Sequence, residues 1–175
     1  MSVVTRRLSA ALLAGVVLAF GVSCASNEDP VSPPVEAPSQ ALIGTLLQSL
    51  NLLSCSTQPY ASTTQTVGPE GGVIVVGTHR LTIPSGALSK RVTIKAEQVS
   101  GRVNSVRFSP EGLRFDKKAQ LTLSYKNCSP LLLLKQVVYI DELLRILDLL
   151  PSRDDRLNKT VTGDVKHFSR YAVAW

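Results

Sequence analysis

The chain is poor in the side chains that most often build catalytic and metal centres. Its 175 residues include two histidines, one methionine and three cysteines, and aromatic residues make up 5% of the sequence. This leaves little material for a metal cage or a multi-residue catalytic site, so we expect a non-enzymatic protein without cofactor, metal ion or small-molecule substrate. The length also excludes a large enzyme, a multi-domain protein and a multi-span membrane protein.

The N-terminus has the pattern of an export signal. Residues 1–7 are short and basic, and residues 8–22 form an uncharged apolar run. This order is typical of a secretory signal peptide. The run is about fifteen residues long, whereas a stable membrane span needs roughly 20. We therefore expect a signal peptide over residues 1–23.

The signal ends in a segment that resembles a bacterial lipobox, Gly21-Val22-Ser23-Cys24, although Gly21 stands where leucine is usual. The resemblance implies cleavage after Ser23 and acylation of Cys24, and two or three acyl chains would hold the protein on a membrane. Ala25 stands where aspartate commonly retains lipoproteins on the inner membrane, which favours the outer membrane or the cell surface. The alternative is a plain signal peptide cut nearby, with no role for Cys24.

Charge narrows the choice of partners. The formal net charge is +6, and removal of Arg6 and Arg7 with the signal leaves 17 basic against 13 acidic residues, or +4. A positive balance favours anionic lipid or polysaccharide surfaces. The aromatic residues do not alternate with a basic run, so we expect no nucleic-acid partner. We therefore expect the partner to be an unknown envelope protein or a surface polymer.

Two segments precede the domain. Residues 24–40 are rich in proline and small polar residues and cannot bury enough surface to order, which predicts a disordered stalk. Residues 41–54 carry leucine and isoleucine at three- and four-residue spacing, which predicts a short amphipathic helix. It either packs on the domain or lies on a membrane or a partner. No lysine or arginine lines its polar face, which favours packing on the domain.

From Thr63 onward the apolar residues recur with a period of two. Short runs of this kind alternate with turns rich in glycine and proline, which predicts an all-β antiparallel sandwich of about eight to ten short strands over residues 63–175. Leucine-rich residues 131–134 and 143–150 are also compatible with a helix. The β-branched residues around Tyr139 instead favour a hairpin that turns near Asp141 and Glu142. The predicted strands cover residues 73–76, 79–83, 92–97, 105–109, 120–125, 136–141, 145–149, 160–166 and 170–174.

The order of these motifs resembles the ZU-five family, which is named for zonula occludens proteins and occurs in netrin receptors and ankyrins. The resemblance covers residues 66–175 and implies a β-sandwich that serves as an interaction module. The segments that carry it are Gly68-Pro69-Glu70-Gly71-Gly72, residues 79–88 (HRLTIPSGAL), residues 109–115 (SPEGLRF), residues 119–125 (AQLTLSY) and residues 167–171 (HFSRY).

The cysteines allow one disulfide if Cys24 is acylated. The remaining pair is Cys55 and Cys128, and export makes their oxidation plausible. The bridge would tie the predicted helical linker to the sandwich and close a loop of about 73 residues, for which chain entropy gives roughly 4 kcal/mol. The alternative is two free buried thiols.

One constellation suggests chemistry. In related domains of death-domain and inflammasome-sensor proteins, a His-Phe-Ser sequence is a self-cleavage site. By resemblance, Ser169 would attack the Phe168 carbonyl with His167 as base. The alternative is structural, with His167 hydrogen-bonded, Phe168 in the core and Ser169 in a turn.

Three function hypotheses follow: a membrane-anchored interaction or scaffolding module, a module that cleaves itself once between Phe168 and Ser169, and a carbohydrate-binding sandwich. The carbohydrate hypothesis lacks a visible aromatic row. The charged run of residues 153–156 (RDDR) could bind a cation, but each aspartate has an arginine neighbour. We therefore expect a solvated loop there.

Overall fold

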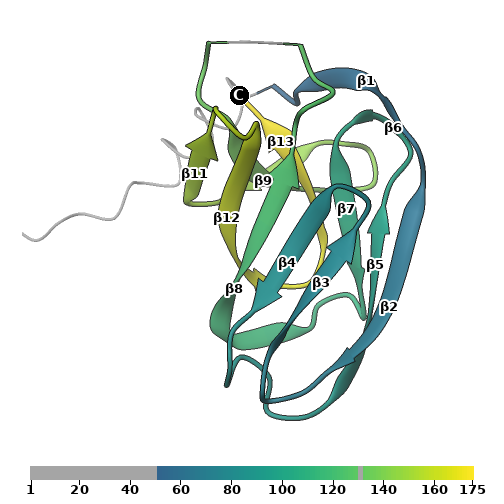
Figure 1. The fold of residues 1–175 in the computed structure, drawn as a ribbon, viewed down its shortest axis with the longest axis vertical. Helices are drawn as coiled ribbons and strands as arrows, with labels where there is room; N and C mark the ends of the chain where they lie inside the picture. The colour runs from purple at the N-terminus through teal and green to yellow at the C-terminus, as the bar shows by residue number, and fades with distance from the viewer. Residues whose placement is uncertain (1–50, 130–131) are drawn as a thin grey trace, which may run out of the picture. The chain divides into compact units, whose positions relative to one another are not determined.

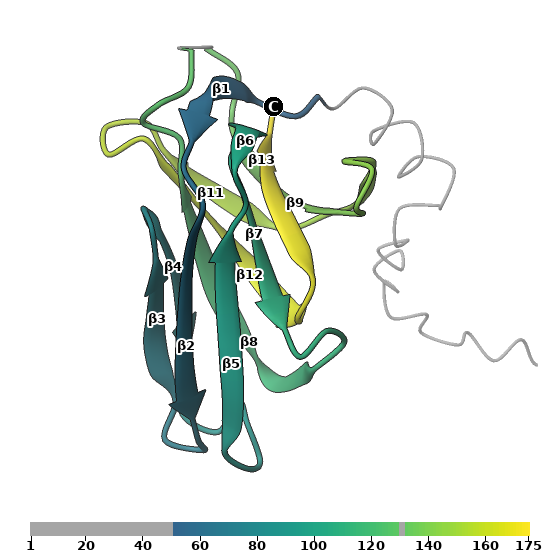
Figure 2. The same ribbon diagram turned by 90° about the vertical axis from the view of Figure 1, so that its right-hand side faces the viewer.

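The computed structural model describes residues 51–129 and 132–175, and these residues form strands and turns without any helix. Thirteen strands form three antiparallel sheets in a sandwich-like arrangement (Figure 1, Figure 2). The predicted all-β antiparallel class is confirmed, with more strands than the eight to ten expected. Within the described residues, no helix is long and apolar enough to cross a membrane.

The largest sheet has six strands and the second has five, while a two-stranded sheet lies at one end (Figure 2). In spatial order, the six strands are β10 (Ile146–Leu149), β9 (Gln136–Ile140), β13 (Arg170–Ala174), β7 (Ser105–Ser109), β5 (Val92–Gln98) and β2 (Ala61–Val67). The five are β11 (Ser152–Asp155), β12 (Thr160–His167), β8 (Arg114–Ser124), β4 (His79–Ile83) and β3 (Gly72–Val76). The small sheet pairs β1 (Ser54–Gln58) with β6 (Gly101–Val103).

The period of two in the sequence explains the core. Leu81 of β4 pairs with Leu121 of β8, and both side chains are almost completely buried because they face inward. Burying one such side chain contributes about 1.5–3 kcal/mol. The layers approach each other closely at Gly163 of β12, where an added Cβ would lie 2.8 Å from the Cβ of Val137 in β9. Any larger residue at position 163 would push the two layers apart.

The turn between β3 and β4 requires glycine. Gly77 has a φ of +55°, and a Cβ there would lie 2.0 Å from Oε1 of Gln98. The Gln98 side chain accepts a hydrogen bond from the Thr78 amide and donates one to the Pro59 carbonyl. Position 77 therefore has both a backbone and a steric reason for lacking a side chain.

Residues 51–54 are extended, so the predicted helix does not include them. Leu52 bridges to Ala174, the Leu53 amide donates to the Val173 carbonyl at 2.9 Å, and Ser54 begins β1. Pairing with β13 satisfies these backbone groups and buries Leu53 completely. Residues 41–50 of that helix lie outside the described residues, as do the predicted signal peptide, the stalk and Cys24.

The predicted hairpin around residue 141 is confirmed. Strands β9 and β10 pair antiparallel, and the Asp141 carboxylate accepts hydrogen bonds from the amides of Leu143 and Arg145. Residues 132–134 belong to neither a helix nor a strand and form an exposed loop before β9. Four strands were not predicted, namely β1, β2, β6 and β11. Their residues are mostly polar or too few to show a period of two.

Candidate functional site

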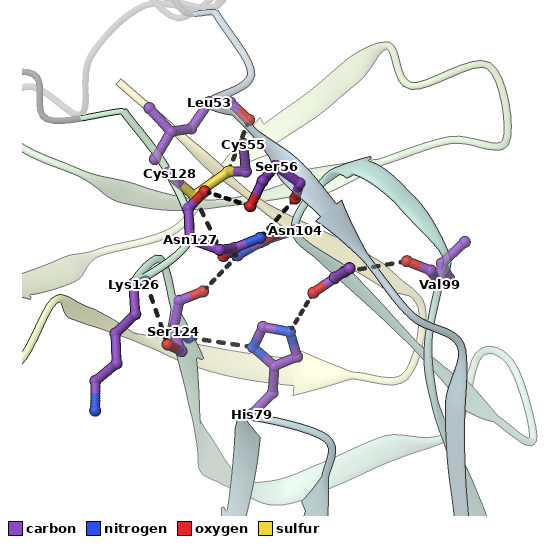
Figure 3. The surroundings of a disulfide bond; sticks show 11 residues. Leu53, Cys55, Ser56, His79, Val99, Asn104, Ser124, Lys126, Asn127 and Cys128 are labelled. Carbon is purple, nitrogen blue, oxygen red and sulfur yellow. Dashed lines mark hydrogen bonds between the residues drawn. A yellow bond between two sulfur atoms is a disulfide. The ribbon is translucent and has the colours of Figure 1, made fainter.

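The predicted disulfide is present and pins the first strand to the sandwich. Cys55 and Cys128 are joined with an S–S distance of 2.01 Å, and both are buried (Figure 3). Cys55 lies within β1, so the bridge ties a strand to the segment after β8 rather than a helical linker. Ser56 adds bonds beside it: its amide and hydroxyl both donate to the Asn127 carbonyl, at 2.9 and 3.0 Å.

Two asparagines form a polar layer beneath the disulfide (Figure 3). Asn104 Nδ2 donates to the Ser124 carbonyl at 2.8 Å and to Asn127 Oδ1 at 2.6 Å. Asn127 Nδ2 donates in turn to the Ser56 carbonyl at 2.7 Å. These bonds compensate for burying the amides and fix the end of the sandwich at which the N-terminal part of the chain joins it.

His79 lies next to this layer, at the start of β4. Its side chain is 1% exposed, its Nδ1 accepts from the Ser124 amide at 3.1 Å, and its Nε2 lies 3.2 Å from Gln58 Oε1. Because an amide N–H donates to Nδ1, the proton of the neutral ring is on Nε2 and is donated to Gln58. Burial lowers the pKa of His79 from 6.5 to about 4. The sequence predicts His79 within a strand but does not predict this role. The one signal for it is that His79 alternates in register with Leu81 and Ile83, which face the core.

The His-Phe-Ser residues lie where β12 gives way to β13: His167 ends β12, and Phe168 and Ser169 form the turn. Phe168 is 1% exposed and packs between Phe108 and Phe115, with ring centroids 5.3 and 5.0 Å away. The Phe168 amide donates to the Leu113 carbonyl at 2.7 Å, and its carbonyl accepts from the Gly112 amide at 3.0 Å. Phe168 is thus part of the core.

The His167 ring contacts the Phe168 carbonyl and Tyr171. Nδ1 lies 3.4 Å from the Phe168 oxygen and 3.5 Å from the Tyr171 hydroxyl, which donates to the His167 carbonyl at 2.6 Å. Among the described residues, no hydrogen bond joins His167 to the Ser169 hydroxyl. Burial of Tyr171 raises the pKa of its hydroxyl, so the group stays a hydrogen-bond donor. Self-cleavage stays a prediction.

Two small hollows flank this turn and share Tyr139 as a wall. One, of about 160 Å³, is lined by His167. The other, of about 140 Å³, is lined by Ser169, Arg107, Arg170 and Glu142. Both guanidinium groups contact the Glu142 carboxylate, and burial lowers the pKa of Arg170. This arginine pair was not predicted from the sequence, because the two residues are far apart in the chain and meet only through the pairing of β7 with β13.

A larger polar hollow of about 400 Å³ lies on the outer face of the five-stranded sheet, where it is lined by residues of β8, β11 and β12. Two of its lining residues, Thr122 and Thr162, share a hydrogen bond of 2.9 Å. No aromatic side chain lines this hollow, so it offers hydrogen-bonding groups without a stacking surface. The lining residues are Gln120, Thr122, Pro151, Ser152, Arg153, Thr162 and Asp164.

The charged run of residues 153–156 is not a solvated loop. The Asp154 side chain is 2% exposed, accepts from the Tyr125 hydroxyl at 2.6 Å and from the Lys135 amide at 3.0 Å, and pairs with Arg156. The predicted solvated loop is wrong because Asp154 is needed to satisfy polar groups that the fold buries. Within residues 51–129 and 132–175, no group of three or more histidine, cysteine or acidic side chains could hold a metal ion.

No family model matches the chain, and no curated protein matches it. The similarity to the ZU-five family therefore depends on the sequence motifs alone and stays a prediction.

Proposed function

We propose that the protein is an envelope lipoprotein, anchored through acyl chains on Cys24, whose ZU-five-like domain is a non-enzymatic interaction or scaffolding module. Its placement on the outer membrane or the cell surface belongs to the same proposal. The partner is an envelope protein or a surface polymer.

The observation that carries the proposal is the rigid attachment of the described domain to the chain that leads toward the anchor. Asn51 and Trp175 exchange two backbone hydrogen bonds, of 3.2 and 3.0 Å. Four residues after Asn51, Cys55 forms the disulfide with Cys128. Such an attachment transmits position and force from an anchor to a folded module. A disulfide also suits a protein that works in an oxidising compartment.

The hollow on the five-stranded sheet is the surface that we assign to the partner. Its hydroxyl, amide and charged groups offer both hydrogen-bond donors and acceptors. The Arg153 guanidinium can only donate, and the Asp164 carboxylate can only accept. A photoreactive residue in place of Arg153 should therefore crosslink to one envelope component in intact cells. The same residue in place of Ser89, an exposed turn position, is the matched control. Equal crosslinking at both positions would contradict this assignment.

Denaturing intact mass spectrometry tests the anchor. The full gene product, expressed in a lipoprotein-competent bacterium, should begin at Cys24, be heavier by its acyl groups and be lighter by two hydrogens for the disulfide. An unmodified chain that starts elsewhere would refute the lipoprotein assignment.

The same spectrum tests self-cleavage, the second candidate. The observation in its favour is the 3.0 Å bond from the Gly112 amide to the Phe168 carbonyl, because such a donor stabilises charge on an attacked carbonyl. A fragment that ends at Phe168, and that is lost in Ser169→Ala, would make this the main activity. Glycan-array binding tests the third candidate, a carbohydrate-binding module, which the polar hollow supports.

A further inference from the structure

We propose that one end of the domain docks directly on an anionic membrane surface through four exposed leucines surrounded by basic side chains. The leucines are Leu132, Leu133 and Leu134 in the loop before β9, and Leu157 in the turn between β11 and β12. Their exposed fractions are 90%, 51%, 61% and 97%. We call these two segments the leucine tip. The inference deepens the proposed function, because it rests on a membrane-anchored protein.

The two segments of the leucine tip form one structure. The Arg156 guanidinium donates to the Leu132 carbonyl at 2.8 Å, and the Lys159 carbonyl accepts from the Tyr125 amide at 2.9 Å. Asp154, buried between them, accepts from the Lys135 amide and holds both segments in place. The exposed leucines therefore have fixed neighbours, which lowers the entropy lost when they enter another phase.

The charges around the leucine tip are complementary to an anionic surface. Lys126, Arg156 and Lys159 are exposed there. The two acidic side chains next to the leucine tip, at the end of β11, are engaged within the protein, since Asp154 is 2% exposed and Asp155 accepts from the Asn158 amide and side chain. Each basic side chain close to an anionic bilayer adds attraction, and leucines beside them enter the interfacial region.

The position of the leucine tip also fits the predicted anchor. The loop before β9, strand β1 and the C-terminus lie at the same end of the sandwich in both views (Figure 1, Figure 2). Asn127, next to Lys126, is bonded to Ser56, so the chain joins the domain beside the leucine tip. Cys24 precedes Asn51 by 27 positions, and a chain of that length reaches at most about 90 Å. An anchor at Cys24 thus keeps this end of the domain within reach of its own membrane.

Quenching by brominated lipids tests the inference in the full-length protein. Trp175 is the only tryptophan of the chain, so Trp175→Phe gives a background for single reporters. Leu133→Trp reports on the leucine tip, and Ser89→Trp reports on an exposed turn in a different part of the domain. Circular dichroism first checks that each variant has the same strand content as the unaltered protein. Each variant is then reconstituted in phosphatidylglycerol-containing vesicles with and without bromine on the acyl chains.

The expected result is loss of most of the Leu133→Trp emission in brominated vesicles and no loss for Ser89→Trp. Reversal of two charges, Lys126→Glu with Lys159→Glu, should relieve the quenching of Leu133→Trp. Because these positions are exposed, neither change is expected to disturb folding. Equal quenching at both reporters, or none at Leu133→Trp, would overturn the inference. If the Leu133→Trp emission changes with protein concentration and not with bromine, the leucines form a contact between two copies of the protein. That result would also overturn the inference.

The outcome for the anchor is read separately. Flotation of the chain with vesicles, and resistance of that association to high salt, report on acylation of Cys24. An association that is lost at high salt refutes the anchor, and with it the proposed function. The comparison of Leu133→Trp with Ser89→Trp in the same vesicles still decides the leucine tip.

Discussion

Acidification should destabilise the domain through His79. The ring is buried and neutral in the folded protein, with its two nitrogens engaged by Gln58 and Ser124, and its pKa is lowered from 6.5 to about 4. The unfolded chain therefore binds a proton between these values and the folded chain does not, so stability falls as the pH falls. One pKa unit corresponds to 1.36 kcal/mol, and this single group lowers the free energy of unfolding by about 2 kcal/mol between pH 8 and pH 5.

Urea unfolding at several pH values, followed by circular dichroism, measures this loss. His79→Gln keeps a hydrogen-bonding side chain without a titrating group, so its absolute stability is lower while its dependence on pH between 8 and 5 should be nearly flat. A wild-type change below about 0.5 kcal/mol over this range would refute the reasoning, since it would mean that the folded ring accepts a proton as easily as the unfolded one. An equal slope in His79→Gln would show that another group is responsible.

Two further predictions concern the disulfide and a turn. Reduction should destabilise the wild-type protein by up to about 4 kcal/mol, because the bridge closes a 73-residue separation; thermal unfolding with and without reductant measures this, and Cys55→Ala with Cys128→Ala should not respond to reductant. Gly77→Ala should lower the free energy of unfolding by about 1 kcal/mol more than Gly112→Ala does. Both positions have positive φ, but only the new Cβ at position 77 meets the Gln98 side-chain amide, which it displaces from its hydrogen bonds to Thr78 and Pro59. Equal losses of stability in urea unfolding would remove the steric part of that argument.

The strand pattern could be read from the sequence because its cause is local. Side chains alternate across a strand, so runs such as residues 79–83 and 170–174 show which residues face the core before any partner strand is known. Turns at glycine and proline ended these runs near the observed boundaries. The pairing of Cys55 with Cys128 was also open to prediction, since setting Cys24 aside leaves one possible partner.

The polar strands escaped prediction because their pairing is not local. Strand β2 contains residues 61–67 and is mostly serine, threonine and glutamine, and it is a strand because β5 satisfies its backbone groups. The C-terminal end of the predicted helix was wrong for a related reason. Leu53 lies three residues after Leu50, which is helical spacing, yet pairing with β13 buries Leu53 in an extended conformation.

The sequence by itself determined the all-β class, most of the core strands and the single disulfide, because period, turn chemistry and cysteine arithmetic are properties of the chain alone. The tertiary structure decided the groups that meet across strands. It buried His79 between Gln58 and Ser124, brought Arg107 and Arg170 onto one carboxylate, and gathered exposed leucines from two separate turns at one end. Each of these depends on strand pairing between distant segments, which no local pattern records.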